Sequence, residues 1–70
     1  MPLVLARVGQ KCTIKDFACS CDTRMRMVNM GLFPGCSIEI LNSINGALLL
    51  KVGGARIMLE RCLAHQIYVN

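Results

Sequence analysis

The chain has 70 residues, a net charge of +4 and 54% apolar side chains. This length allows a single domain, residues 1–70, which buries only about 60% of the surface that the unfolded chain exposes, so the core must be mostly aliphatic. The mean hydropathy is +0.51, but Arg7 and Lys51 interrupt the apolar runs, and none reaches the about 20 residues of a membrane span. We therefore expect no direct insertion into a membrane.

The N-terminal segment and the cysteines indicate the compartment. Residues 1–6 lack the basic residues that open a signal peptide, and five cysteines are an odd number. Both observations argue for reduced thiols rather than a disulfide framework, so a cytoplasmic location is expected. The pI near 9.0 suits an acidic partner, although the basic residues are scattered singly, as on an ordinary solvated surface.

The first half of the chain predicts a strand followed by a short helix. Polar and apolar side chains alternate over residues 11–15, which is typical of a half-buried strand. Asp22 or Thr23 can cap a helix that runs to about Met30 and ends at a left-handed Gly31. Two helical turns are unstable alone and must be held by packing. The residues best placed to pack are Met27, Val28 and Met30.

The second half predicts short strands joined by tight turns. Asn45 and Gly46 both tolerate the positive φ that a two-residue hairpin demands, and Gly53-Gly54 marks a second turn. The strands are expected at residues 37–41, 47–52, 55–59 and 67–69, with one helical turn within 60–65. Together with the first strand they predict a mainly β fold, a small barrel of about five strands whose closure removes exposed edges.

No catalytic constellation is visible. The single histidine, His65, belongs to no Ser/His/Asp set, and the four carboxylates show no pairing that the sequence reveals. Gly53-Gly54 lacks the glycine spacing and the Lys-Ser/Thr of a nucleotide-binding loop. We expect neither enzymatic activity nor a cofactor.

Four side chains are candidate metal ligands: Cys19, Cys21, Cys62 and His65. Thiolate and imidazole bind Zn²⁺ or Cu(I) well, and Cys62 and His65 would share a face of a helical turn. However, Cys-x-Cys is not the usual spacing of a structural zinc site. Loop thiols and a surface histidine are the simpler interpretation, with a Cys/Met metal-handling protein as an alternative.

Two motifs stand out, MGLFPG at residues 30–35 and VGGARIML at residues 52–59. The first is similar to the Leu-Gly-Leu-x-Pro-Gly motif of the FeoA family, with Met at the first position, and the second is similar to another pattern of that family. The resemblance covers nearly the whole chain. It implies an SH3-like barrel with a short inserted helix, no enzymatic activity and no required cofactor.

The same resemblance implies a function and a partner. FeoA proteins are small cytosolic accessories of bacterial ferrous-iron uptake, and the implied partner is FeoB, a membrane permease with a cytosolic G-protein domain. The implied role is binding and modulating that permease. The chain departs from the family pattern in its short hairpin at Asn45 and Gly46, and in Cys62, where a charged residue is common.

A docking surface is expected where the helix meets the MGLFPG motif. Leu32 is expected to turn inward. Phe33, held between Gly31 and Pro34, costs little entropy to immobilise, which favours a binding hot spot. The expected partner-binding residues are Arg24, Met25, Arg26, Leu32, Phe33 and Pro34. The expected structural turns are Gly31, Gly35, Asn45, Gly46, Gly53 and Gly54.

Two other interpretations remain open. An RNA-binding SH3-like module fits the basic charge and the opening segment VGQKCTI, but one Tyr and two Phe leave few stacking platforms. We therefore expect no nucleic-acid partner. Self-association is also plausible for so apolar a chain.

Overall fold

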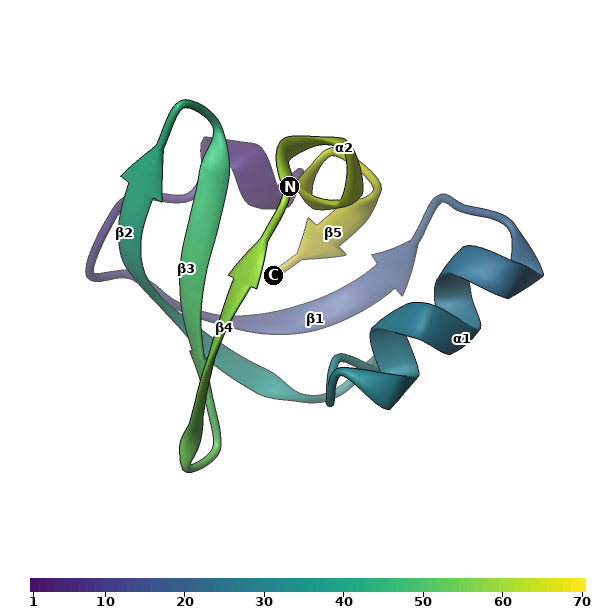
Figure 1. The fold of residues 1–70 in the computed structure, drawn as a ribbon. Helices are drawn as coiled ribbons and strands as arrows, with labels where there is room; N and C mark the ends of the chain where they lie inside the picture. Colours follow the sequence, from purple (N-terminus) through teal and green to yellow (C-terminus); the bar gives the residue numbers. More distant parts are fainter.

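The computed structural model describes all residues, 1–70, as one antiparallel five-stranded sheet with three short helical segments (Figure 1). The strand order is β4-β3-β2-β1-β5, which confirms the mainly β fold. The elements are η1 (Leu3–Leu5), β1 (Lys11–Phe17), α1 (Cys21–Asn29), β2 (Ser37–Ile44), β3 (Ala47–Val52), β4 (Ala55–Leu59), α2 (Arg61–Ala64) and β5 (Ile67–Val69).

Two irregularities in the strands curve the sheet around its core. β1 pairs with β2 over residues 11–13 and with β5 over residues 14–17, and the β1–β5 pairing has a register shift between Ile14 and Asp16. β2 has a similar shift between Ile40 and Asn42. Such bulges bend a strand and increase its twist. Pairing continues through both of them, so these two strands are longer than the alternation of side chains predicted.

The core is made only of apolar side chains. Sixteen residues are buried, none of them polar or charged, and no buried side-chain nitrogen or oxygen lacks a hydrogen-bond partner. The buried residues include Cys12 and Ile14 of β1, where the alternation predicted a half-buried strand, and Leu48 and Leu50 of β3. The core therefore depends on aliphatic packing, as the composition requires.

The N-terminal residues pair with β5, which the sequence did not reveal. The backbone of Met1 donates to the carbonyl of Val69 at 3.0 Å and accepts from its N–H at 2.7 Å. Pro2 bridges to Tyr68, and Leu3 is fully buried. One edge of the sheet is thus covered by the chain itself, and β4 is the other edge. Because β4 does not pair with β5, the prediction that closure removes the exposed edges was wrong.

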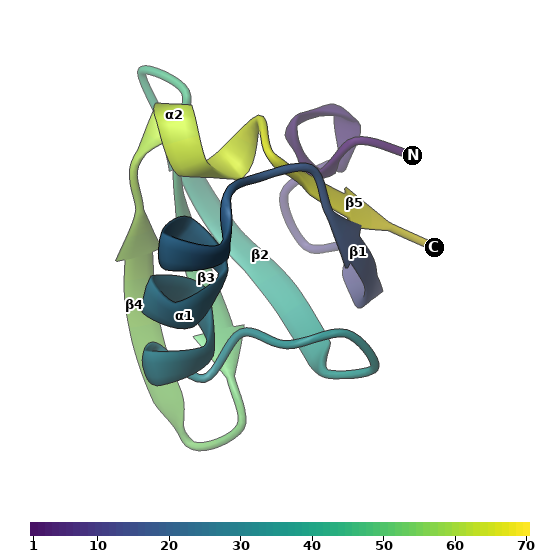
Figure 2. The same cartoon turned by 90° about the vertical axis from the view of Figure 1, so that its right-hand side faces the viewer.

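α1 stands beside the sheet and differs from the prediction in two respects (Figure 2). Its cap is Ser20, whose Oγ accepts from the N–H of Thr23 at 3.2 Å; the prediction of Asp22 or Thr23 as the cap was wrong. Val28, expected to pack, is 47% exposed, because only the Met27 side of so short a helix reaches the core. Neither α1 nor α2 has the length and hydrophobicity that a membrane-spanning helix requires.

Replacing Ser20 tests whether it is the N-cap of α1. Ser20→Ala should lower the free energy of unfolding by about 1 kcal/mol, because the N–H of Thr23 loses its acceptor. Asp22→Ala removes only a charge near the helix dipole and should cost about 0.3 kcal/mol. Urea denaturation of both variants measures the difference. A larger loss for Asp22→Ala would contradict the Ser20 cap.

Candidate protein-interaction surface

The end of α1 forms a Schellman motif, which determines where the next side chains lie. Gly31 has φ +92°, its N–H donates to the carbonyl of Val28 at 2.9 Å, and the N–H of Leu32 donates to the carbonyl of Met27 at 2.9 Å. These two bonds and the left-handed glycine are the defining features of the motif. The structural turn expected at Gly31 is therefore present, in the conformation that was predicted.

A second turn follows immediately. The N–H of Cys36 donates to the carbonyl of Phe33 at 3.0 Å, Pro34 is second in this turn and Gly35, with φ +95°, is third. Proline at the second position and a positive φ at the third are the requirements of a type II turn. The N–H of Gly35 also donates to the carbonyl of Ile14 at 2.8 Å, which attaches the turn to β1.

We call residues 31–36 the elbow. It is fixed to α1 at one end and to β1 at the other, and the Sγ of Cys36 lies 3.6 Å from the carbonyl oxygen of Gly31, across the loop. Within it, Leu32 is fully buried, whereas Phe33 is 49% exposed. The elbow therefore holds one side chain in the core and presents its aromatic neighbour to solvent on a constrained backbone.

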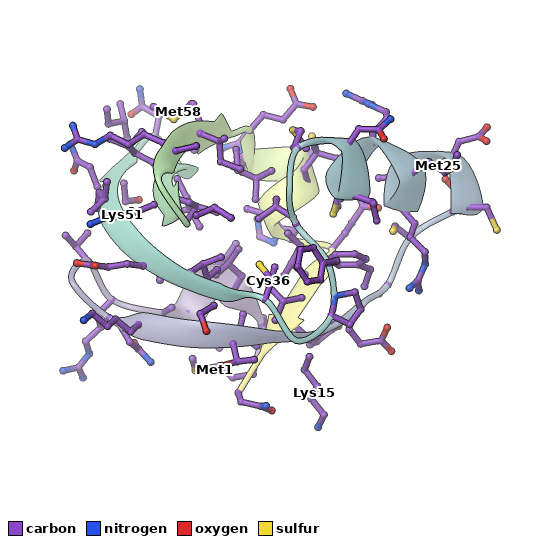
Figure 3. All side chains as sticks on the ribbon, turned by 90° about the horizontal axis from the view of Figure 1, so that it is seen from below. Met1, Lys15, Met25, Cys36, Lys51 and Met58 are labelled. Carbon is purple, nitrogen blue, oxygen red and sulfur yellow. The ribbon has the colours of Figure 1, made fainter.

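Phe33 lines a shallow hollow next to the β3–β4 turn. The hollow has a volume of 390 Å³ and is lined by Gly31, Phe33, Cys36, Ser37, Val52 and Gly53. In the view of Figure 3, Cys36, the last residue of the elbow, lies near the centre of this end of the molecule. The aromatic ring thus stands beside a partly apolar depression rather than alone on a flat surface.

The predicted site residues on α1 are less closely grouped. Met25 is 64% exposed but projects from the outer end of α1, away from the elbow (Figure 3). Arg24 turns towards β1, where it lies 3.6 Å from the Asp16 carboxylate and 5.4 Å from the ring centroid of Phe17. Arg26 is exposed. The structure thus exposes Phe33 and Met25 but does not bring them together.

Val28 is the surface residue that sequence reasoning missed. It follows Met25 by three positions, and residues three apart lie on the same helix face. Its exposure extends the apolar surface of α1 towards its C-terminal end, where the elbow begins. Spacing alone could not reveal this, because the helical wheel does not say which side the sheet covers.

The other predicted turns are present. Asn45 and Gly46 have φ 52° and 85°, both positive as the two-residue hairpin requires, and Gly53 has φ 60°. They connect strands at a distance from the elbow, with the exception of Gly53, which lines the hollow. Their role is to set the register of the hairpins.

The candidate metal ligands do not form a cluster. The structure contains no group of three or more His, Cys, Asp or Glu side chains that could hold a metal ion. Cys21, Cys62 and His65 are exposed, and Cys19 is half-buried. All five cysteines are free thiols, and burial raises the pKa of the Cys12 thiol.

The comparisons with known proteins agree with this geometry. The fold is a small SH3-like β module. The family model described as "FeoA domain" matches residues 1–70, so the chain belongs to the FeoA family.

Individual relatives support the assignment. The chain is 29% identical over 69 residues to a putative Fe(2+) transport protein A of Methanocaldococcus jannaschii, covering 99% of this chain and 84% of that one. A crystal structure of an iron uptake regulatory protein (FeoA) superimposes with a TM-score of 0.89 at 32% identity, covering 99% and 92% of the two chains. Iron(II) transport protein A from Clostridium thermocellum gives 0.89 at 30% identity, covering 99% and 44%.

The two adjacent elbow residues should differ in their effect on stability. Leu32→Ala leaves a cavity in the core and should cost about 2–5 kcal/mol of unfolding free energy. Phe33→Ala removes a half-exposed ring and should cost less than about 1 kcal/mol. Chemical denaturation provides the measurement. Equal losses would show that Phe33 is a core residue.

Thiol alkylation tests the state of the cysteines. With N-ethylmaleimide under native, reducing conditions, the exposed Cys21 and Cys62 should react first and Cys19 more slowly. Cys12 and Cys36 should react only on unfolding, since burial restricts access and a raised pKa lowers the thiolate fraction at Cys12. Mass spectrometry identifies the sites. Protection of Cys21 and Cys62 that a chelator removes would instead indicate a bound metal.

Proposed function

We propose that this chain is a cytoplasmic accessory of ferrous-iron uptake that binds the cytosolic region of a FeoB-type permease and modulates it through protein–protein contact. Membership of the FeoA family and the names of its relatives support the connection with iron transport. The observation that carries the binding proposal is the half-exposed Phe33 on a backbone fixed at both ends.

The physical advantage of this arrangement is entropic. Ordering a flexible loop on binding costs free energy for each residue that becomes fixed. In the elbow, the hydrogen bonds to Met27, Val28 and Ile14 already fix the backbone before a partner arrives. An aromatic side chain beside a hollow then supplies a buried contact at low cost, as binding hot spots do.

A protein partner fits this surface better than RNA. Of the two phenylalanines, Phe17 is buried, so the exposed aromatic rings are Phe33 and Tyr68. They lie on different elements, the elbow and β5. Base recognition by a β-sheet module uses several neighbouring rings, which this surface does not offer.

Phe33→Ser tests the proposal. Its affinity for the purified cytosolic region of the permease should fall about 30-fold, as for a hot-spot residue, while the thermal midpoint stays close to that of the parent. Ile44→Ser is a matched control, because Ile44 is similarly exposed, at 51%, but lies at the β2–β3 hairpin. Unchanged capture by folded Phe33→Ser would remove this residue from the interface.

A further inference from the structure

One edge strand of the sheet is covered by another segment of the chain, and the other edge strand is not. Met1 and Pro2 cover the edge of β5. The backbone of β4, in contrast, makes no hydrogen bond in any turn, loop or cap, and β3 is its one neighbour in the sheet. Figure 2 shows β4 at the margin of the molecule. An open strand edge is a template for pairing with another chain.

The β3–β4 register shows which groups of this edge are free. Gly53 and Gly54 form a two-residue turn, so the pair that closes it is hydrogen-bonded, and the pairs alternate from there. The N–H and C=O groups of Arg56 and Met58 therefore point away from β3. Two donors and two acceptors face outward along β4.

A row of charges crosses the outer face of the sheet and ends at this edge. The register places Lys11 beside Glu39, Glu39 beside Lys51, and Lys51 beside Arg56. The row thus holds three cations and one carboxylate, with no ion pair among them, and the last two cations are directly opposite one another, which is destabilising. No carboxylate lies within ion-pair distance of Arg56. A negative charge on the far side of Arg56 would relieve this imbalance.

The neighbours of Arg56 are apolar. Met58 is on the same outer face and 52% exposed, and Figure 3 shows it and Lys51 on the side of the molecule away from α1. Ile57, on the inner face, is only partly buried. A strand placed beside β4 would therefore find one basic and two apolar positions in succession.

We propose that the open edge of β4 binds an extended acidic segment of a partner protein by strand addition. A carboxylate of the segment lies beside Arg56 and apolar side chains lie beside Ile57 and Met58. In this mode the main chain supplies the hydrogen bonds and the alternating side chains supply specificity. The proposal concerns a surface separate from the elbow and does not depend on the permease being the partner.

A designed peptide is the probe. Blocked Thr-Ser-Val-Val-Glu-Ile-Ser-Thr, titrated into the ¹⁵N-labelled full chain, should shift the amide signals of Arg56 and Met58 most. Replacing Glu by Gln should weaken binding about two- to fivefold, the range expected for one cross-strand charge pair, and replacing it by Lys should weaken it further. The main chain of the peptide is the same in all three.

Variants of the chain distinguish the contribution of the Arg56 charge to peptide binding from that of the outward backbone N–H of Met58. Arg56→Glu should reverse the preference, so that the Lys peptide binds better than the Glu peptide. Lys11→Glu makes the same change of net charge at the other end of the row and should leave the preference as it is. Met58→Pro removes an outward N–H and should abolish binding, whereas Met58→Ala keeps the N–H and should retain it.

Several results would overturn the proposal. These are equal binding of the Glu and Lys peptides, peptide-induced shifts centred on Phe33 instead of β4, and a single-stranded RNA that shifts Lys51 and Arg56 when no peptide does. A concentration-dependent dimer that Met58→Pro dissociates would assign the edge to a second copy of the chain. If Met58→Pro fails to fold, Arg56→Glu still tests the proposal, because it should reverse the preference between the Glu and Lys peptides.

Discussion

The left-handed backbone at Gly31 determines where the side chains of the elbow lie. A residue with a Cβ rarely adopts this conformation, and two hydrogen bonds from the elbow back to α1 form only when it is adopted. Leu32 is then carried into the core, and the following type II turn holds Phe33 half-exposed. The φ angle of Gly31 thus allows Leu32 to be buried while its neighbour Phe33 is exposed.

The same constraint positions α1. This helix has nine residues, too few to be stable by itself, and Met27 is its one buried residue. The Schellman motif joins Met27 to Leu32, so the helix and the elbow share an attachment to the core. A consequence is that most of α1 stays uncovered, including the apolar side chains of Met25 and Val28.

Much of the fold could be predicted from the sequence because its signals are local. Each predicted turn was marked by glycine, proline or asparagine, and β3, β4 and β5 follow the expected bounds. The errors have non-local causes. Bulges between Ile14 and Asp16 and between Ile40 and Asn42 lie where the alternation stops, and the strands continue through them. The pairing of Met1 with Val69 joins opposite ends of the chain.

The site was predictable to the extent that one motif defines it. Leu32 inward and Phe33 outward follow from MGLFPG. On α1, Met27 and Met30 pack against the core as predicted, but Val28 is exposed. A helical wheel gives only relative directions, and the sheet determines which direction is inward. The cap at Ser20 was missed because Ser, Asp and Thr are all suitable cap residues. Only the residue at which α1 begins in the structure, Cys21, shows which of the three is the cap.

The central claim is that the elbow is rigid before any partner binds, and amide hydrogen exchange measures this most directly. The N–H groups of Gly31, Leu32 and Gly35 all donate to backbone carbonyls. We expect them to exchange about as slowly as those of β1 in the free protein. Exchange at the rate of an unstructured peptide would show that the loop is ordered only on binding, and would contradict the account.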